Sequence, residues 1–277
     1  MEIEGKVIYK EKEELLTCIL ASLEEGRIPW RKSWKGGMRY AKNFHSSHVF
    51  RGINDLIAGC SGFDTPYFLT QKQIEKLGGK LKKNAKALPM VFWEKKGRTL
   101  NMKFYRVYNV EEVLGIKFDF EKTAKRKADL SAAEQLLAHM PRRPSIDISL
   151  RDTACYNVLL DTIYMPGFGR IKSVENYYQL LIPRLIQASG HASRLGREGL
   201  VAKIRMGKNN FSSEDLITDI GAGMLYRKLG LDFPKLRDKN MYIRRWINEL
   251  NANNQNIFLA AGAARAAVAY IEGRAAT

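Results

Sequence analysis

Cysteine and histidine are both scarce in this chain. Its 277 residues include three cysteines, Cys18, Cys60 and Cys155, and four histidines. The cysteines are scattered and form no pairing motif, which argues against a disulfide framework. This usage is typical of a reduced compartment in which cysteines are small core residues, and we predict a cytoplasmic location.

Long apolar runs are lacking as well. All are far shorter than the roughly 20 residues that cross a bilayer, and the first residues, Met-Glu-Ile-Glu-Gly-Lys, do not resemble a signal peptide. We therefore expect no membrane association. Hydrophobic residues still make up 45% of the chain, enough to fill buried cores. The length allows one large domain or two of ordinary size.

Positive charge is abundant and unevenly distributed. The net charge is +17, and residues 27–106 alone hold 18 Lys or Arg against four Asp or Glu. The same residues include three of the four tryptophans, Trp30, Trp34 and Trp93. Cations that follow phosphates, beside rings that stack on bases, are what a single-stranded nucleic acid site requires. The alternative is a solvated basic surface over an ordinary aromatic core.

The N-terminal part, residues 1–116, predicts a basic α+β domain. Apolar periodicity indicates a helix over 9–25, and a second helix begins near Phe50. Between them lies a loop in which Trp30 and Trp34 are expected to be exposed among cations.

A third helix and a hairpin are expected later in this domain. The helix covers residues 70–77 and is capped by Thr70. Strands over 88–94 and 101–110 enclose a basic hairpin tip at 95–98.

The candidate DNA-binding residues are the cationic, aromatic and amide side chains of the loop, the second helix, the lysine-rich segment and the hairpin. They are Trp30, Arg31, Lys32, Trp34, Arg39, Tyr40, Lys42, Asn43, Phe50, Arg51, Asn54, Lys80, Lys82, Lys83, Trp93, Lys95, Lys96 and Arg98.

A second, mainly helical domain is predicted over residues 147–277, after a charged and proline-containing linker at 117–146. A strand pair is expected within 152–166. The expected helices begin at Ser173 and cover 214–228, 239–251 and 255–272. Pro183 lies inside the first of these helices, where a proline costs about 3 kcal/mol, so the sequence predicts a kink or break near Ile182. The fold class is α+β with two domains.

Both domains carry residues that resemble one known family. In the second domain the matches are Ala154, Tyr156, Asp161, Ile163, Met165, Pro166, Ser173, Tyr177, Tyr178, Gly190, His191, Ser193, Arg194, Leu195, Arg197 and the segment 214–222. These resemble the metallopeptidase-like domain of the ArdC-type antirestriction proteins, whose relatives include TraC-like primases. In the first domain, the pattern from Pro29-Trp30 to Phe50-Arg51-Gly52-Ile53-Asn54, and then to Gly115, resembles the N-terminal domain of the same family, which is associated with single-stranded DNA binding.

The resemblance implies a zincin-like second domain that has lost its metal. Intact members place His-Glu-x-x-His where this chain has Pro183-Arg184-Leu185-Ile186-Gln187, so two ligands and the general base are missing. Asp219 stands in place of a glutamate of the family. The degenerate former metal site comprises Pro183, Arg184, Gln187, His191, Asp215 and Asp219. We expect no metal, no other cofactor and no catalysis, and a salt bridge from Arg184 to Asp215 or Asp219 in place of the metal.

The resulting prediction is a single-stranded DNA-binding antirestriction-type protein of a plasmid or phage, with a catalytically dead zincin-like domain. One alternative is a pseudoenzyme that binds a host restriction, defence or replication protein. Another is a metallopeptidase with displaced ligands, built from His191, Asp215, Asp219 or His139. Primase activity would need paired carboxylates in the basic domain, and no such pair is identifiable.

Overall fold

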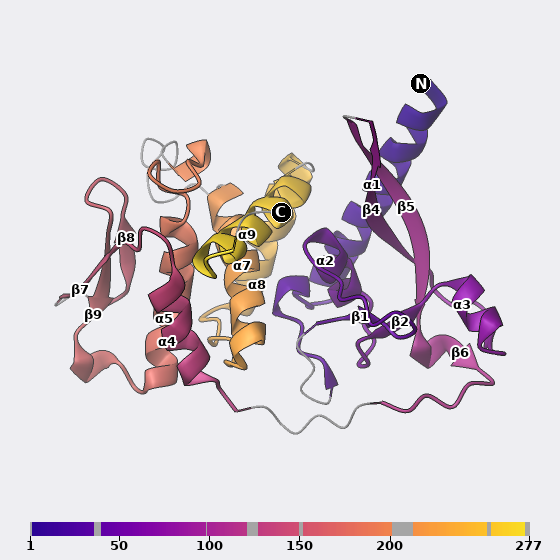
Figure 1. The fold of residues 1–277 in the computed structure, drawn as a ribbon, viewed down its shortest axis with the longest axis horizontal. Coiled ribbons are helices and arrows are strands. Elements are labelled where there is room, and N and C mark those ends of the chain that lie inside the picture. The colour runs from indigo at the N-terminus through magenta and orange to yellow at the C-terminus, as the bar shows by residue number, and fades with distance from the viewer. Residues whose placement is uncertain are drawn as a thin grey trace. The chain divides into compact units, whose positions relative to one another are not determined.

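The computed structural model describes residues 2–35, 40–97, 99–120, 127–149, 152–200, 213–253 and 256–274. The chain divides into two compact units, and the predicted α+β class is confirmed. Unit 1 comprises residues 1–125 and 240–254, and unit 2 comprises residues 126–239 and 255–277. Figure 1 labels the helices and strands of both units. The sequence-based domains differ from these units in two ways: residues 240–254 of the predicted second domain belong to unit 1, and the predicted linker is divided between the two units.

Unit 1 combines helices with a mixed sheet. Its helices are α1 (Glu2–Glu24), α2 (Ile53–Cys60), α3 (Gln71–Lys76) and α8 (Lys239–Ala252). A four-stranded sheet has the order β1-β2-β5-β4, with β1 (Lys42–Asn43), β2 (Tyr67–Leu69), β4 (Leu88–Lys96) and β5 (Thr99–Asn109). A second pair consists of β3 (Lys80–Leu81) and β6 (Val113–Leu114).

The hairpin and the third helix of unit 1 follow their local signals. Strands β4 and β5 are antiparallel, with an unbroken register from Leu88↔Val107 to Lys96↔Thr99. Thr70 accepts a hydrogen bond from the Gln73 N–H, and the Gln73 side chain accepts one from the Thr70 N–H. This capping box confirms the predicted start of α3.

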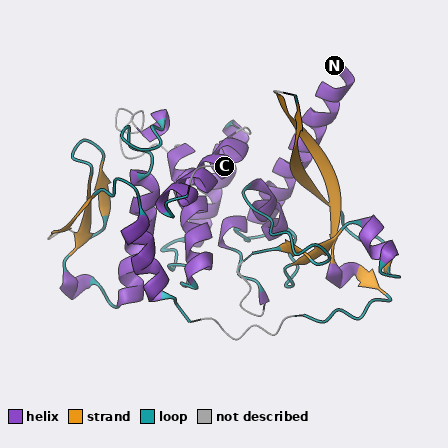
Figure 2. Ribbon diagram, in the orientation of Figure 1, coloured by secondary structure: helices purple, strands orange, loops and turns teal. Residues whose placement is uncertain are grey.

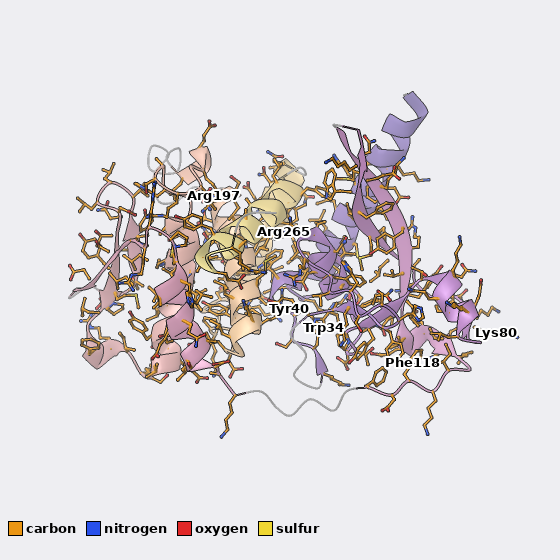
Figure 3. The ribbon with its side chains drawn as sticks, viewed as in Figure 1. Trp34, Tyr40, Lys80, Phe118, Arg197 and Arg265 are labelled. Carbon is orange, nitrogen blue, oxygen red and sulfur yellow. The ribbon has the colours of Figure 1, made fainter. Side chains whose placement is uncertain are left out.

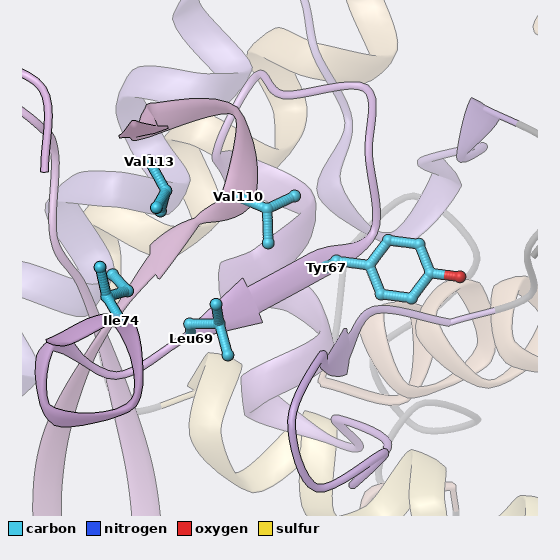
Figure 4. Close-up of a cluster of buried hydrophobic side chains, with 5 residues drawn as sticks. All are labelled: Tyr67, Leu69, Ile74, Val110 and Val113. Atoms are coloured by element: carbon cyan, nitrogen blue, oxygen red, sulfur yellow. The ribbon is translucent and has the colours of Figure 1, made fainter. Parts of the chain in front are cut away.

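The core of unit 1 forms where strands and helices meet. Leu15, Ile19 and Leu23 of α1 are fully buried, as their spacing predicts. A separate cluster joins β2 and α3 to the end of β5 (Figure 4). Its buried members are Tyr67, Leu69, Ile74, Val110 and Val113.

Unit 2 is mainly helical with a small sheet (Figure 2). Its helices are α4 (Leu130–His139), α5 (Val174–Ala188), α7 (Ser213–Leu229) and α9 (Asn256–Ile271). The sheet has the order β7-β9-β8, with β7 (Ser145–Ser149), β8 (Cys155–Asn157) and β9 (Thr162–Pro166). The predicted strand pair is β8 and β9, whereas β7, parallel to β9, begins inside the predicted linker.

Helix α5 is continuous through Pro183, so the break predicted near Ile182 is wrong. Proline lacks the N–H that would reach the carbonyl of Gln179, four residues earlier. The hydroxyl of Tyr226 on α7 donates to that carbonyl at 2.6 Å instead. A side chain from another helix therefore supplies the donor that Pro183 lacks.

Candidate nucleic-acid interface and former metal site

The two tryptophans of the first loop are core residues. Trp30 is 0% exposed, and its indole N–H donates to the hydroxyl of Tyr242 on α8 at 2.9 Å. Its ring also meets Trp246 edge-on, with centroids 5.9 Å apart. Trp34 is buried edge-on against Phe68. The prediction that these rings are exposed is wrong, because a distant helix and a strand cover them.

Three more candidates of this region have structural contacts. Phe50 is buried, and the amide of Asn43 exchanges hydrogen bonds with Gln73. Asn54 accepts from the Val91 N–H and donates to the Val91 carbonyl, both at 2.7 Å. The amide of Asn54 thus pairs with the backbone of β4 as a neighbouring strand would.

The cations around this loop differ in exposure. Lys32 is partly buried, with its ammonium 5.1 Å from the Trp34 ring centroid, and burial lowers the pKa of Lys32. The ammonium of Lys42 lies 5.3 Å from the ring centroid of Tyr67. Arg51 is exposed. Arg31 and Tyr40 are partly buried, and Arg39 lies outside the described residues.

A group of exposed lysines surrounds α3 and β3, and we call it the lysine patch. The predicted members Lys80, Lys82 and Lys83 are exposed, and Lys80 is labelled in Figure 3. The structure adds further exposed lysines from α3 and from the segment before β4. They are Lys72, Lys76 and Lys86. Sequence reasoning passed over these three, although their positions beside Lys80–Lys83 in the chain were a usable signal.

The hairpin carries exposed aromatic residues as well as lysine. Trp93 is 58% exposed and Lys95 is exposed, so both predicted DNA-binding residues are accessible. Phe92, which sequence reasoning missed, is 43% exposed and meets Tyr105 with ring centroids 5.9 Å apart. The side chain of Lys96 and the whole of Arg98 lie outside the described residues.

A second aromatic group packs within unit 1. The rings of Tyr67, Phe120 and Phe118 are nearly parallel, with successive centroids 5.1 and 6.0 Å apart, and Phe44 meets all three edge-on. Phe118 is labelled in Figure 3. Phe118 and Phe120 lie in the predicted linker, yet their rings pack with Tyr67 and Phe44 of unit 1.

Arg184 lies in the predicted former metal site on α5. It is partly buried, and its guanidinium donates to the Gln187 side-chain oxygen at 2.8 Å. Burial lowers the pKa of Arg184, while the charges of Asp215 and Asp219 on α7 act to raise it. The hydrogen bond goes to Gln187 rather than to an aspartate, so the two carboxylates act on Arg184 through their charge.

Close packing of α5 on α7 brings these side chains together. A Cβ on Gly221 would lie 2.9 Å from the Ile186 side chain, so a larger residue at position 221 would have to displace that side chain. The segment 214–222 therefore places Asp215 and Asp219 on the helix that faces Pro183–Gln187.

His191 contacts Ser193 in the loop after α5. Its Nδ1 lies 2.8 Å from the Ser193 hydroxyl and accepts from the Ser193 N–H at 3.2 Å. Within the described ranges, no group of three or more His, Cys, Asp or Glu side chains is placed to hold a metal ion.

A buried ion pair joins the end of α5 to the start of α7. Arg197 donates to Glu214, which is 2% exposed, and also to the Ile186 carbonyl and the Ser189 hydroxyl. The Arg197 guanidinium lies directly over Gly190, where a Cβ would be 2.6 Å from it. The matched residues Gly190 and Arg197 thus form one structural contact (Figure 3 labels Arg197).

A second network joins the sheet of unit 2 to the loop after α5. Arg194 forms an ion pair with Asp161 and donates to the Ala188 carbonyl. The Tyr156 hydroxyl donates to Asp161 at 2.7 Å. Burial acts to raise the pKa of Asp161, but the hydrogen bonds from Arg194 and Tyr156 outweigh it and hold that pKa below its ordinary value.

Comparison with known protein families identifies both halves of the chain. Residues 9–130 match the N-terminal domain of the anti-restriction factor ArdC, and residues 131–263 match a zincin-like metallopeptidase domain. The chain belongs to the ArdC-type antirestriction family.

Among the residues that the structure describes, no helix is both long and apolar enough to cross a membrane.

Solved structures agree with this assignment. The ArdC antirestriction protein of plasmid R388 with Mn(II) bound is 27% identical to this ArdC-like chain, with a TM-score of 0.74 over 94% of this chain and 96% of that one. Its metal-free form is 25% identical, with a TM-score of 0.71 over the same shares of the two chains.

The curated relatives are of two kinds. A DNA primase TraC of Escherichia coli is 25% identical over 90% of this chain, but the match spans only 26% of that primase. The uncharacterized protein y4eC of Sinorhizobium fredii is 24% identical over 91% of this chain and 88% of its own length. The ArdC-like chain therefore spans about a quarter of the length of the TraC relative.

Proposed function

We propose that this ArdC-like protein binds single-stranded DNA through unit 1 and that its zincin-like domain cleaves no peptide bond. The observation that carries the first part is the surface of unit 1. The lysine patch offers six exposed ammonium groups, and Trp93 offers a ring that is 58% exposed. Exposed cations neutralise phosphates, and an exposed ring stacks on a base of any identity.

The absence of catalysis is proposed from the chemistry at Arg184. A metallopeptidase needs a carboxylate here as general base, and His ligands at positions 183 and 187. Pro183 has no ligand atom, and the partly buried guanidinium of Arg184 has the wrong charge for a base. A fixed cation also repels a divalent metal ion in a site shielded from water.

DNA binding is tested by fluorescence anisotropy of a labelled single-stranded oligonucleotide, with a duplex of the same sequence in parallel, across a salt series. We expect tighter binding to the single strand and an affinity that falls steeply with salt. The variant Lys80→Ala/Lys82→Ala/Lys83→Ala should bind more weakly and with a smaller salt slope. Lys172→Ala/Lys235→Ala/Lys239→Ala removes the same charge from exposed lysines elsewhere and should keep the affinity. Equal loss in both triple variants would contradict a specific role for the patch.

The loss of the metal site is tested by metal analysis of the purified protein incubated with Mn(II) or Zn(II). We expect no stoichiometric metal in the natural sequence. A variant with Pro183→His, Arg184→Glu, Gln187→His and Asp219→Glu restores the family pattern and should gain metal binding. Stoichiometric metal in the natural sequence, or cleavage of a casein substrate that a chelator abolishes, would refute the proposal.

One observation favours binding of a host protein as a second function. Three large apolar side chains of unit 2 are strongly exposed, with Leu159 at 84%, Leu160 at 63% and Phe168 at 75%. Exposed apolar groups of this kind are common at protein interfaces. If they bind a host restriction, defence or replication protein, Leu159→Ser/Leu160→Ser/Phe168→Ser should abolish protection from restriction in cells and leave DNA affinity unchanged.

A further inference from the structure

The outer part of the β4–β5 hairpin exposes one aromatic ring on each face. Phe92 and Trp93 are consecutive residues of β4, and the register with β5 is unbroken around them. Successive side chains of a strand point to opposite faces. Because Phe92 is 43% and Trp93 58% exposed, each face of the hairpin presents one accessible ring.

Each of these rings lies beside a lysine on its own face. Lys103 is directly opposite Phe92 in the ladder, so the two side chains share a face. Lys95 follows Trp93 by two residues and therefore shares the other face. Residues 92–105 hold four Lys or Arg, Lys95, Lys96, Arg98 and Lys103, against the single acid Glu94. The hairpin thus complements a phosphate backbone on either side.

The base of this hairpin is held firmly by the rest of unit 1. Asn54 pairs with both backbone groups of Val91, the residue just before Phe92. Arg106, opposite Pro89, forms ion pairs with Glu14 and Glu11 on α1. Beyond these anchors the two strands continue with α1 alongside them (Figure 1). An anchored ribbon with one ring on each face has the form of a wedge.

We propose that this hairpin binds the junction between single-stranded and double-stranded DNA and separates the two strands there. One strand lying along one face would use only one ring. At a junction, a base of one strand stacks on Trp93 and a base of the other stacks on Phe92, while Lys95 and Lys103 face the two backbones. The inference rests on the proposed single-strand binding and specifies the DNA structure that the same unit recognises.

The test compares three labelled DNAs at one salt concentration: a single strand, a duplex, and a fork with two unpaired arms. We expect the natural protein to bind the fork more tightly than the single strand by about fivefold or more, the lower end of what one base-ring stack contributes. Phe92→Leu and Trp93→Leu should each remove most of this preference. Leu114→Ala changes a side chain that is 52% exposed elsewhere in unit 1 and should leave the preference unchanged.

A second measurement uses only the natural protein. 2-Aminopurine replaces the base next to the junction, first on one arm of the fork and then on the other. Stacking on a ring should quench its fluorescence at both positions, with less quenching in the interior of the single-stranded arms.

Two results would overturn the junction proposal while leaving single-strand binding intact. One is equal affinity for fork and single strand, and the other is a fork preference that survives both leucine variants. A dimer in sedimentation equilibrium that Trp93→Leu dissociates, with no fork preference, would assign the rings to self-association instead. Failure to bind any single-stranded DNA would refute the proposed function together with this inference.

Discussion

The hydroxyl of Tyr226 donates a hydrogen bond to the carbonyl of Gln179, 2.6 Å away. Gln179 is the residue whose carbonyl the missing N–H of Pro183 would have reached. Tyr226 itself is 4% exposed, so little water can take its place. The proline of the predicted former metal site is therefore tolerated because the neighbouring helix compensates for it.

Replacing Tyr226 with Phe should destabilise unit 2 by about 1–3 kcal/mol, the cost of leaving a buried carbonyl without a donor. Pro183→Ala returns an N–H to position 183 and should reduce the cost of Tyr226→Phe to less than half. Urea unfolding of the two single variants and the double variant gives the coupling free energy. Strictly additive effects would show that the hydroxyl does not compensate for the proline.

Trp30→Ala should lower stability by about 3–5 kcal/mol, because it leaves a cavity in a packed core. It also removes the donor to Tyr242. Trp93→Ala changes an exposed ring and should alter the melting temperature very little, while weakening DNA binding. Thermal unfolding and anisotropy on the same preparations separate the two effects. Loss of DNA affinity in a fully folded Trp30 variant would contradict this division of roles.

Arg197→Ala should destabilise unit 2 by about 3–5 kcal/mol, since it leaves the buried carboxylate of Glu214 without its partner. Adding Glu214→Gln removes the unpaired charge and should recover part of the loss. Chemical unfolding measures the free energy of unfolding of the single variant and of the double variant. Arg170→Ala is the matched control, because the ion pair of Arg170 with Asp152 is largely exposed and should contribute little.

Acid should weaken unit 2 through Asp161. Its pKa is lowered in the folded state, so its ion pair with Arg194 contributes fully above the ordinary aspartate pKa of about 4. The contribution is lost as the pH falls below that value towards the folded-state pKa. Unfolding free energies measured from pH 6 downward should fall less steeply for Asp161→Asn than for the natural sequence. Asp152→Asn, at an exposed position, should follow the natural curve.

Local signals in the sequence were sufficient for much of the fold. The hairpin follows from two apolar strands around Lys95–Arg98, and the start of α3 follows from Thr70 and Gln73. The start of α5 follows from Ser173, whose hydroxyl accepts from the Asn176 N–H. Each of these features is decided by residues that are close in sequence, which is why periodicity and capping rules predicted them.

Features decided by distant residues escaped prediction. Trp30 looks like an exposed ring among cations until Tyr242 and Trp246 pack on it from more than 200 positions away. Asn54 looks like a DNA contact until its amide pairs with Val91. In the candidate site, the departure of residues 183–187 from the His-Glu-x-x-His pattern of the family can be read from the sequence. The hydrogen bond of Arg184 to Gln187 could not be predicted from the sequence, because which nearby acceptor the guanidinium reaches depends on side-chain geometry.

The return of α8 to unit 1 determines how the protein can be divided for experiments. A fragment that stops at residue 125 omits Tyr242 and Trp246 and leaves the indole of Trp30 without its hydrogen-bond acceptor. A fragment that begins at residue 126 carries α8 without its partners and exposes the apolar side of Trp246. Expressing the two sequence-defined halves separately would therefore yield an incomplete core in one and an aggregation-prone helix in the other. A DNA-binding fragment would need 239–252 joined back to the N-terminal segment by a linker.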